Sequence, residues 1–152
     1  LKSILIDYLE IYGNDEASVR NRKILDGCME YFKEETVPQY ELLFTEEEFS
    51  KKLYFLKAGM VELTASRSSA ENKRRRLMKV SVGGCFGELG FFLRRKQPFK
   101  AIAMEPSVLF TLSKHDMARM QNENPELCAL VHKTIVKSLC LASSFQIESQ
   151  LF

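Results

Sequence analysis

The segment from Phe86 to Ala103 contains the side chains that are best suited to hold a ligand in this chain of 152 residues. It begins with a Gly-Glu turn, continues through a short apolar stretch that predicts a helical turn and then a polar loop, and ends in a run typical of a strand. Backbone N–H groups at such a turn can hold a phosphate. The layout predicts a phosphate-cradling pocket, but the polar loop lacks the chemistry for a phosphate, which indicates a ligand-binding fold that has lost its ligand.

Composition and charge narrow the function classes. The chain is 45% hydrophobic and 28% charged, which is ordinary for a soluble globular protein with one domain and a helical extension. The net charge of +2 is too small to favour nucleic acid, and no apolar run approaches the roughly 18–20 residues that cross a bilayer. No signal peptide opens the chain, and because it begins at Leu1 instead of Met we expect it to be part of a longer protein.

The cysteines and histidines do not predict an enzyme or a metal site. The cysteines lack the close spacing of a zinc site, and we expect four reduced, buried thiols in an intracellular protein: Cys28, Cys85, Cys128 and Cys140. His115 and His132 fall in predicted helices without a serine, cysteine or carboxylate spaced for a triad or a metal. We therefore expect no catalysis, no metal and no cofactor.

The ends of the chain predict helices. One apolar stripe runs from Leu1 to Tyr12, and a second helix follows with Leu25, Cys28, Met29 and Phe32 on one face, until residues 34–38 break the pattern. Near the other end, residues 113–116 fit a capping box that opens a short helix. Asn124-Pro125 then begins a longer helix, with Asn as N-cap and Pro at the first helical position.

The middle of the chain predicts short antiparallel strands that form a small barrel or roll. The predicted strands are Tyr40–Phe44, Leu53–Lys57, Met60–Ala65, Leu77–Val82, Lys100–Met104 and Ser107–Leu112. The polar stretch Ser66–Arg76 is typical of an exposed hairpin loop. The fold class is therefore α+β, with a helical extension or connector over residues 1–38, a jelly-roll-like β-roll over 39–113 and closing helices over 114–152.

Three segments resemble the cyclic-nucleotide-binding domain fold. They are Leu53–Gly59, the Gly84–Leu89 turn, and the Ser107–Leu112 strand before a capped helix. The resemblance covers roughly residues 25–140, and the cassette aligns without gaps through Ala103. It implies a β-roll with a short helix inside a phosphate-binding cassette.

The resemblance also implies roles for the cassette residues. Glu88 matches the glutamate that binds the ribose 2′-hydroxyl of a cyclic nucleotide, and the turn around it is made by Phe86, Gly87, Leu89 and Gly90. In this fold an arginine then pairs with the cyclic phosphate. The next residue donates a backbone N–H, and a small residue leaves space for the ligand.

The chain departs from that pattern at consecutive positions. Gln97 replaces the arginine, Pro98 has no N–H to donate, and Phe99 takes the place of the small residue. Losing the charge-assisted contact alone costs about 1.5–3 kcal/mol, or roughly ten- to a hundredfold in affinity. We expect a vestigial pocket in which Glu88 caps backbone N–H groups of the cassette helix.

A rescue of anion binding is the alternative. Lys100 replaces a hydroxyl residue, and Arg94, Arg95 and Lys96 lie on the same loop, so one of these cations would have to reach the phosphate. Because side chains alternate along a strand, Lys100 faces out if Phe99 faces in. We expect Phe91–Leu93 to form an apolar plug under the roll. The basic run Lys73, Arg74, Arg75 and Arg76 is either a solvated hairpin tip or a contact with acidic lipids or partners.

A finer resemblance concerns the segment Ala103–Ser113 with Met120, Asn124–Leu127 and His132. It is similar to the domain that follows a STAS domain in some SulP-type membrane transporters. We therefore expect a non-catalytic regulatory or assembly domain of a larger protein on the cytosolic face of a membrane. Its partners would be neighbouring domains, a second copy or another protein bound through the helices. The alternative is a sensor in which a cyclic nucleotide or another anion enters the roll.

Overall fold

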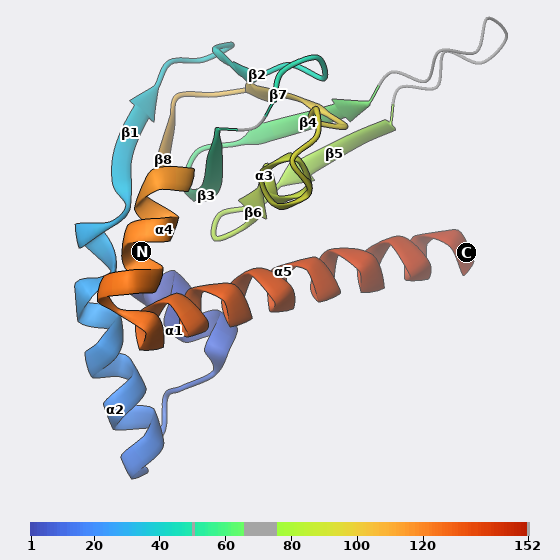
Figure 1. The fold of residues 1–152 in the computed structure, drawn as a ribbon. Helices are drawn as coiled ribbons and strands as arrows, with labels where there is room; N and C mark the ends of the chain where they lie inside the picture. Colours follow the sequence, from blue (N-terminus) through green and yellow to red (C-terminus); the bar gives the residue numbers. More distant parts are fainter. Residues whose placement is uncertain (50, 66–75, 152) are drawn as a thin grey trace, which may run out of the picture. The chain divides into compact units, whose positions relative to one another are not determined.

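The computed structural model describes residues 1–49, 51–65 and 76–151, and it divides into two compact units (Figure 1). The helical unit comprises Leu1–Tyr31 and His115–Phe152, and the strand unit comprises Phe32–Lys114. Helices and antiparallel strands together confirm the predicted α+β class.

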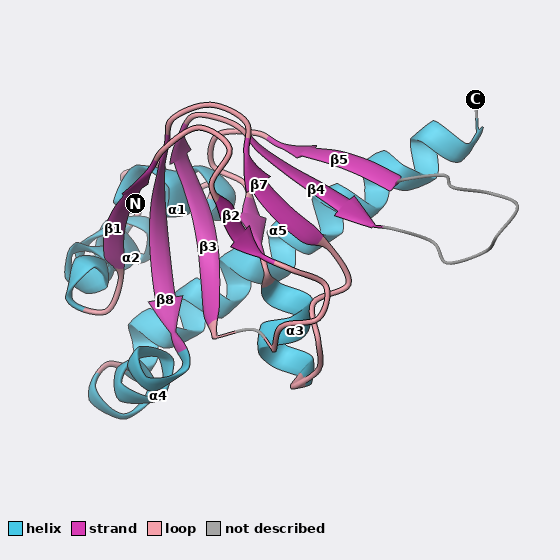
Figure 2. Ribbon diagram, turned by 90° about the horizontal axis from the view of Figure 1, so that it is seen from above, coloured by secondary structure: helices cyan, strands magenta, loops and turns pink. Residues whose placement is uncertain are grey.

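The strand unit contains two antiparallel sheets of four strands each, in the orders β1-β8-β3-β6 and β2-β7-β4-β5 within the described residues (Figure 2). The strands are β1 (Lys33–Val37), β2 (Leu42–Phe44), β3 (Lys52–Ala58), β4 (Val61–Ala65), β5 (Arg76–Val80), β6 (Cys85–Phe86), β7 (Lys100–Ala103) and β8 (Ser107–Ser113). The short helix α3 (Glu88–Leu93) lies between β6 and β7 along the chain. The sheets form a roll, and within the described residues the strands make two separate sheets and not the closed barrel that the sequence left open as the other possibility.

All six predicted strands are present, and the structure adds two strands that the sequence did not predict, β1 and β6. β1 pairs along its whole length with β8, from Lys33 opposite Thr111 to Val37 opposite Ser107, where the sequence had predicted only a break after a helix. Its residues carry charge instead of an apolar alternation, and only Val37 is buried, so the strand signal was weak. β6 has two residues, too few for a pattern. Most of the predicted hairpin loop lies outside the described residues, but Arg76 belongs to β5.

The core of the strand unit lies between the inward faces of its strands. It consists of Val37, Phe44, Tyr54, Leu56, Val61, Leu63, Phe86, Ala101, Ala103 and Leu109. Burying one large apolar side chain stabilises a fold by about 1.5–3 kcal/mol, so this cluster is the main stabilising element of the unit.

The helical unit consists of α1 (Lys2–Leu9), α2 (Glu16–Ile24), the 3₁₀ helix η1 (Leu25–Glu30), α4 (Lys114–Glu123) and α5 (Pro125–Leu151). The predicted second helix is divided: Asp15 caps α2 by accepting a hydrogen bond from the Ser18 N–H at 3.0 Å, and η1 follows. Met29 was expected to face inward but is exposed. The predicted cap of α5 is confirmed, because Asn124 Oδ1 accepts from the Leu127 N–H at 3.2 Å.

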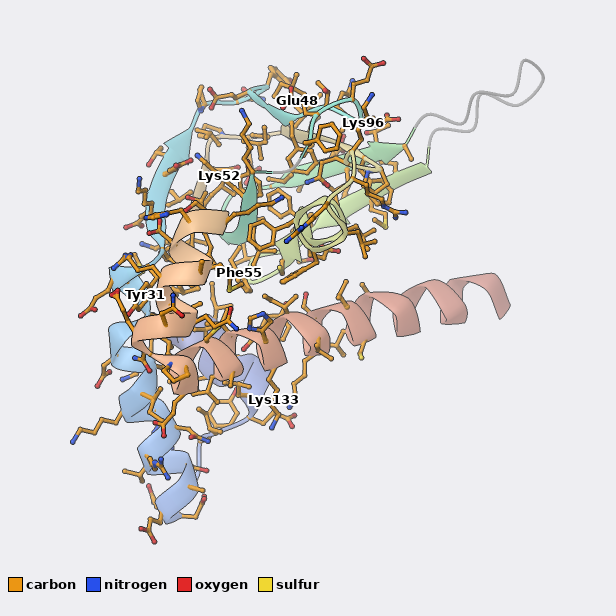
Figure 3. The ribbon with its side chains drawn as sticks, viewed as in Figure 1. Tyr31, Glu48, Lys52, Phe55, Lys96 and Lys133 are labelled. Atoms are coloured by element: carbon orange, nitrogen blue, oxygen red, sulfur yellow. The ribbon has the colours of Figure 1, made fainter. Side chains whose placement is uncertain are left out.

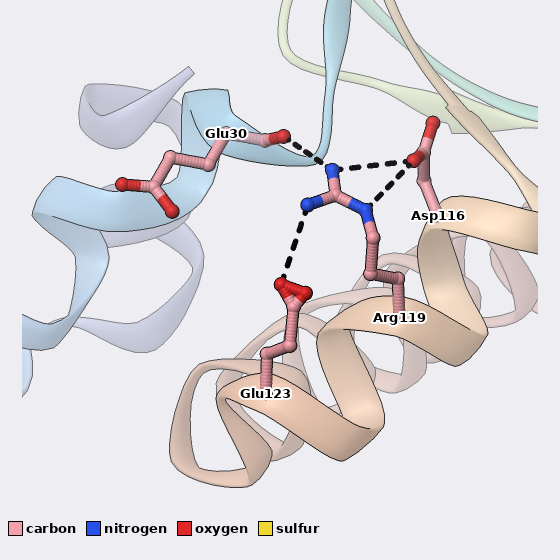
Figure 4. Close-up of polar contacts among 4 residues, drawn as sticks. All are labelled: Glu30, Asp116, Arg119 and Glu123. Atoms are coloured by element: carbon pink, nitrogen blue, oxygen red, sulfur yellow. Dashed lines mark hydrogen bonds and ion pairs between the residues drawn. The ribbon is translucent and has the colours of Figure 1, made fainter.

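Arg119 joins α4 to η1 within the helical unit (Figure 4). Its Nη2 donates to the backbone oxygen of Glu30 at 2.7 Å, and the guanidinium forms ion pairs with Asp116 and Glu123 on its own helix. The guanidinium also lies 4.6 Å from the centre of the Tyr31 ring, a favourable cation–π distance. One side chain therefore holds the end of η1 against α4.

The polar and sulfur side chains agree only in part with expectation. All four cysteines lie in the described residues as reduced thiols, but Cys85 is half-buried and Cys140 is exposed, so the expected burial of all four is wrong. His115 and His132 are both exposed. No described group of three or more histidines, cysteines or carboxylates is arranged for a metal ion. Among the described helices, none combines the length and the apolar character needed to span a membrane.

Candidate functional site

The cassette begins at a turn that requires glycine. Gly87 follows β6 with φ of 82°, in the left-handed region, and a Cβ there would lie 3.1 Å from Tyr54 Cδ2 and 3.3 Å from the Lys52 oxygen. Glycine is therefore the residue that lets the chain leave β6 and enter α3 at this point. Glu88 occupies the first turn of α3, and the helix ends at Leu93, followed by the capping residue Arg94, which has φ of 51°.

Gln97 lies inside the cassette and is bonded to it. Its side chain is only 3% exposed, and Nε2 donates a hydrogen bond to the Gly87 oxygen at 3.1 Å. The same amide covers Gly90, where an added Cβ would lie 2.8 Å from Gln97 Cδ. The side chain at the position where the resemblance implies an arginine therefore bonds to the protein's own backbone.

The backbone of this loop is held by the segment after β2. The Gln97 N–H donates to the Glu48 oxygen at 3.0 Å, and Phe49 forms an isolated bridge with Lys96. The labelled side chains of Glu48 and Lys96 mark these two neighbouring segments (Figure 3). Sequence reasoning did not include residues 48–49 in the site, because no ligand-binding residue type marks them. An open pocket of about 440 Å³ lies beside Gln97, lined by Leu43, Phe44, Glu48, Phe49, Lys51, Lys52 and Tyr54.

Phe99 packs against the core of the strand unit. Ala101 and Ala103, two and four residues further along, are fully buried in the same core, as expected when alternate residues share one face of a strand. Lys100 lies between them in sequence and is half-buried. Arg94, Arg95 and Lys96 are exposed. The structure therefore packs an aromatic ring against the core beside the cassette, while Arg94, Arg95 and Lys96 stay exposed.

Aromatic rings also fill the roll behind the turn. Tyr54 and Phe86 stack at 5.0 Å between ring centroids with an interplanar angle of 9°, and Phe44 lies 5.7 Å from Tyr54 and 6.2 Å from Phe86. Burial raises the pKa of Tyr54 to about 12, so its phenol stays neutral at physiological pH. Sequence reasoning placed Phe86 in the site but missed Phe44 and Tyr54, because apolar strand residues carry no signal for a ligand.

Glu88 is the one acidic group in the turn. Burial raises the pKa of its carboxyl group, and a hydrogen bond with its own backbone N–H opposes that rise. No ion pair to Glu88 is found among the described residues. Burial, and then the charge of Glu88, raise the pKa of the Cys85 thiol, which is therefore protonated and unreactive at neutral pH. Glu88 is thus positioned at the start of α3 without a cation to balance it in the described structure.

The predicted apolar plug of α3 is wrong for two of its three residues. Phe91 is 6% exposed and lies under the Lys114 ammonium group, which is 5.9 Å from the ring centre. Phe92 and Leu93 are 41% and 56% exposed. A helix turns by about 100° per residue, so three consecutive side chains cannot all face one core.

The sequence comparison assigns the family. The model of the cyclic nucleotide-binding domain matches residues 34–124, and the chain belongs to this family. The match includes the two sheets and the whole cassette. No curated protein matches the chain.

Solved structures share the fold at low sequence identity. A cyclic nucleotide-binding domain from Methylobacillus flagellatus KT has a TM-score of 0.78 at 18% identity, covering 99% of this chain and 84% of that one. The catabolite activator protein of Thermus thermophilus has a TM-score of 0.67 at 19% identity, covering 96% of this chain but only 63% of the activator, so this chain spans less than two thirds of its length. The sensor domain of the regulator DNR from Pseudomonas aeruginosa has a TM-score of 0.59 at 16% identity, covering 91% and 93%.

The contact between Gln97 and Gly90 predicts a measurable coupling. Gly90→Ala alone should destabilise the protein, since its methyl group would overlap the amide of Gln97. Gln97→Ala alone removes the hydrogen bond to Gly87 and should cost about 1–3 kcal/mol. In the double variant the new methyl group has space. The double variant should therefore lose less unfolding free energy than the two single variants together, by about 0.5–3 kcal/mol in urea unfolding. Additive losses would show that Gln97 does not cover Gly90.

The burial of Glu88 predicts a pH-dependent gain on removing its charge. Its folded pKa lies above its unfolded value of about 4.3, so between the two values the folded state binds more protons and stability falls as pH rises. The full penalty is present at pH values above the folded pKa and absent below about 4.3. Glu88→Gln should therefore raise the melting temperature more at neutral pH than near pH 4, measured by calorimetry. The exposed Glu47→Gln is the control, and an equal gain at both pH values would contradict the assignment.

Proposed function

We propose that this chain is a non-catalytic regulatory or assembly domain that keeps the cyclic nucleotide-binding fold and no longer binds cyclic nucleotides with useful affinity. Family membership supports the fold and the regulatory character. The observation that carries the proposal is the buried amide of Gln97, which is hydrogen-bonded to Gly87 and packed on Gly90.

Charge, donor count and space all argue against a bound phosphate. Gln97 carries no charge, Pro98 has no N–H, and the half-buried Phe99 packs against the core. To reach a phosphate, Gln97 would have to give up its hydrogen bond to Gly87, so a ligand must first compensate for a contact that the protein already makes. The cyclic nucleotide would therefore have to compete with the protein for its own pocket.

A second candidate function is the sensor, and Glu88 is the observation that favours it. A partly buried carboxyl group whose pKa is raised costs stability, and residues that cost stability are often retained because they bind something. In this reading a cyclic nucleotide or another small anion enters the roll. Binding to the purified chain distinguishes the two functions.

The test is a titration with cyclic AMP and cyclic GMP, followed by thermal unfolding. We expect no shift at millimolar ligand, whereas a binder at a hundredfold excess over Kd would stabilise the fold by about 2.7 kcal/mol. The variant Gln97→Arg/Pro98→Ala/Phe99→Ala restores the three missing features, and it should gain affinity by at least about tenfold from the charged contact. Adding Glu88→Ala to that variant is the matched control and should remove the gain. A clear shift with the unchanged chain would overturn the proposal in favour of the sensor.

We further propose that the domain belongs to a SulP-type membrane transporter, on the cytosolic face and following a STAS domain. The support is the sequence resemblance of Ala103–Ser113 and Asn124–Leu127 to the domain appended to such transporters. Its work would then be contact with neighbouring domains, a second copy or a partner protein. Membrane spans and a STAS domain encoded upstream of Leu1 are the expected result, and a different upstream architecture would remove this assignment.

A further inference from the structure

Two soft sulfur donors and an imidazole nitrogen meet in the helical unit. The Cys128 Sγ atom lies 3.9 Å from the Met117 Sδ atom and 3.5 Å from the His132 Nδ1 atom. Cys128 and His132 lie four residues apart on α5, so they share one face of the helix, and Met117 comes from α4. This group has no part in the cassette. It differs from the common metal sites made of histidine, cysteine and carboxylate side chains because one of its members, Met117, is a thioether.

We propose that Met117, Cys128 and His132 form a binding site for monovalent copper. Thiolate, thioether and imidazole together are the ligands that select Cu(I) over harder cations. The proposal does not depend on the function proposed for the cassette.

The distances already suit a single ion. With metal–sulfur bonds of about 2.3 Å and a metal–nitrogen bond of about 2.0 Å, as for tetrahedral zinc, the observed separations give angles at the metal of about 115° between the two sulfurs and about 110° between sulfur and nitrogen. These angles fall between tetrahedral and trigonal coordination. Two of the three separations between the ligand atoms, both measured from Cys128 Sγ, therefore already suit one ion.

Burial of the site favours a monovalent ion over a divalent one. Cys128 and Met117 are 4% and 9% exposed, so the two sulfur ligands are largely shielded from water. On binding, the Cys128 thiol releases its proton to solvent, and Cu(I) with one thiolate is neutral. The same ligands around a divalent ion would leave an uncompensated positive charge in a buried position, which is costly.

His132 provides the entry and the adjustable ligand. Its side chain is exposed, and its Nδ1 lies 2.8 Å from the Cys128 backbone oxygen. To bind the metal, Nδ1 must present its lone pair, so the ring carries its proton on Nε2 and the contact with that oxygen is given up. The imidazole then closes the site over the two sulfurs.

The test uses the 152-residue chain with Cys140→Ser, which removes the exposed thiol. Cu(I) is supplied as its bicinchoninate complex in oxygen-free buffer, and the loss of colour reports transfer to the protein. We expect one equivalent per chain to be taken up. Met117→Leu and His132→Gln should each weaken binding by more than about tenfold, because even residues that only support a metal ligand cost about 10–100-fold when mutated. Cys28→Ala, another buried cysteine of the helical unit, is the matched control for Cys128→Ala and should bind as the parent does.

A second measurement does not depend on the folding of any variant. The protein is labelled with ¹³C at the methionine methyl groups and observed by NMR, since Cu(I) is diamagnetic and does not broaden the signals. One of the six methionine signals should shift when Cu(I) is added. Met117→Leu identifies that signal. Unchanged Cu(I) affinity in Met117→Leu and His132→Gln, or a Met117 signal that does not move, would show that a thiol alone binds the ion and would overturn the proposal.

Discussion

The hydrogen bond from Gln97 Nε2 to the Gly87 oxygen holds the polar loop of the cassette against its Gly-Glu turn. It links the loop before β7 to the start of α3, and the same amide covers Gly90. The backbone N–H of Gln97 extends the connection to Glu48, so three segments meet at one residue. A neutral amide can make these contacts without the cost of burying a charge. An arginine at this position would carry that cost unless an anion balanced it.

The sheets could be predicted from the sequence because most of their strands carry a regular pattern and are separated by turns. β1 could not be predicted from the sequence. Lys33–Val37 forms a strand because it pairs with β8, about seventy residues away, and it buries only Val37. The division between α2 and η1 was also missed, because the apolar residues from Leu25 onward fit a helix of either period.

The candidate site shows the same limit. The residue types of Gln97, Pro98 and Phe99 by themselves predict a poor phosphate site, because charge and donor count are properties of the residues themselves. The hydrogen-bond partner of the Gln97 amide could not be predicted. It depends on the space that Gly90, which has no side chain, leaves for that amide on the other side of the cassette. The meeting of Met117 with Cys128 and His132 depends in the same way on how α4 and α5 are joined at Asn124.

The charges of β1 have a consequence for how the protein behaves at high concentration. β1 is the edge of its sheet, and an edge strand presents unpaired backbone groups to any chain that can add a strand. Here three consecutive residues of β1, Lys33, Glu34 and Glu35, carry charges on both faces of the edge strand, and a strand added beside them would have to remove water from them. Desolvating these ions is unfavourable, so the edge resists the strand addition that leads to aggregation.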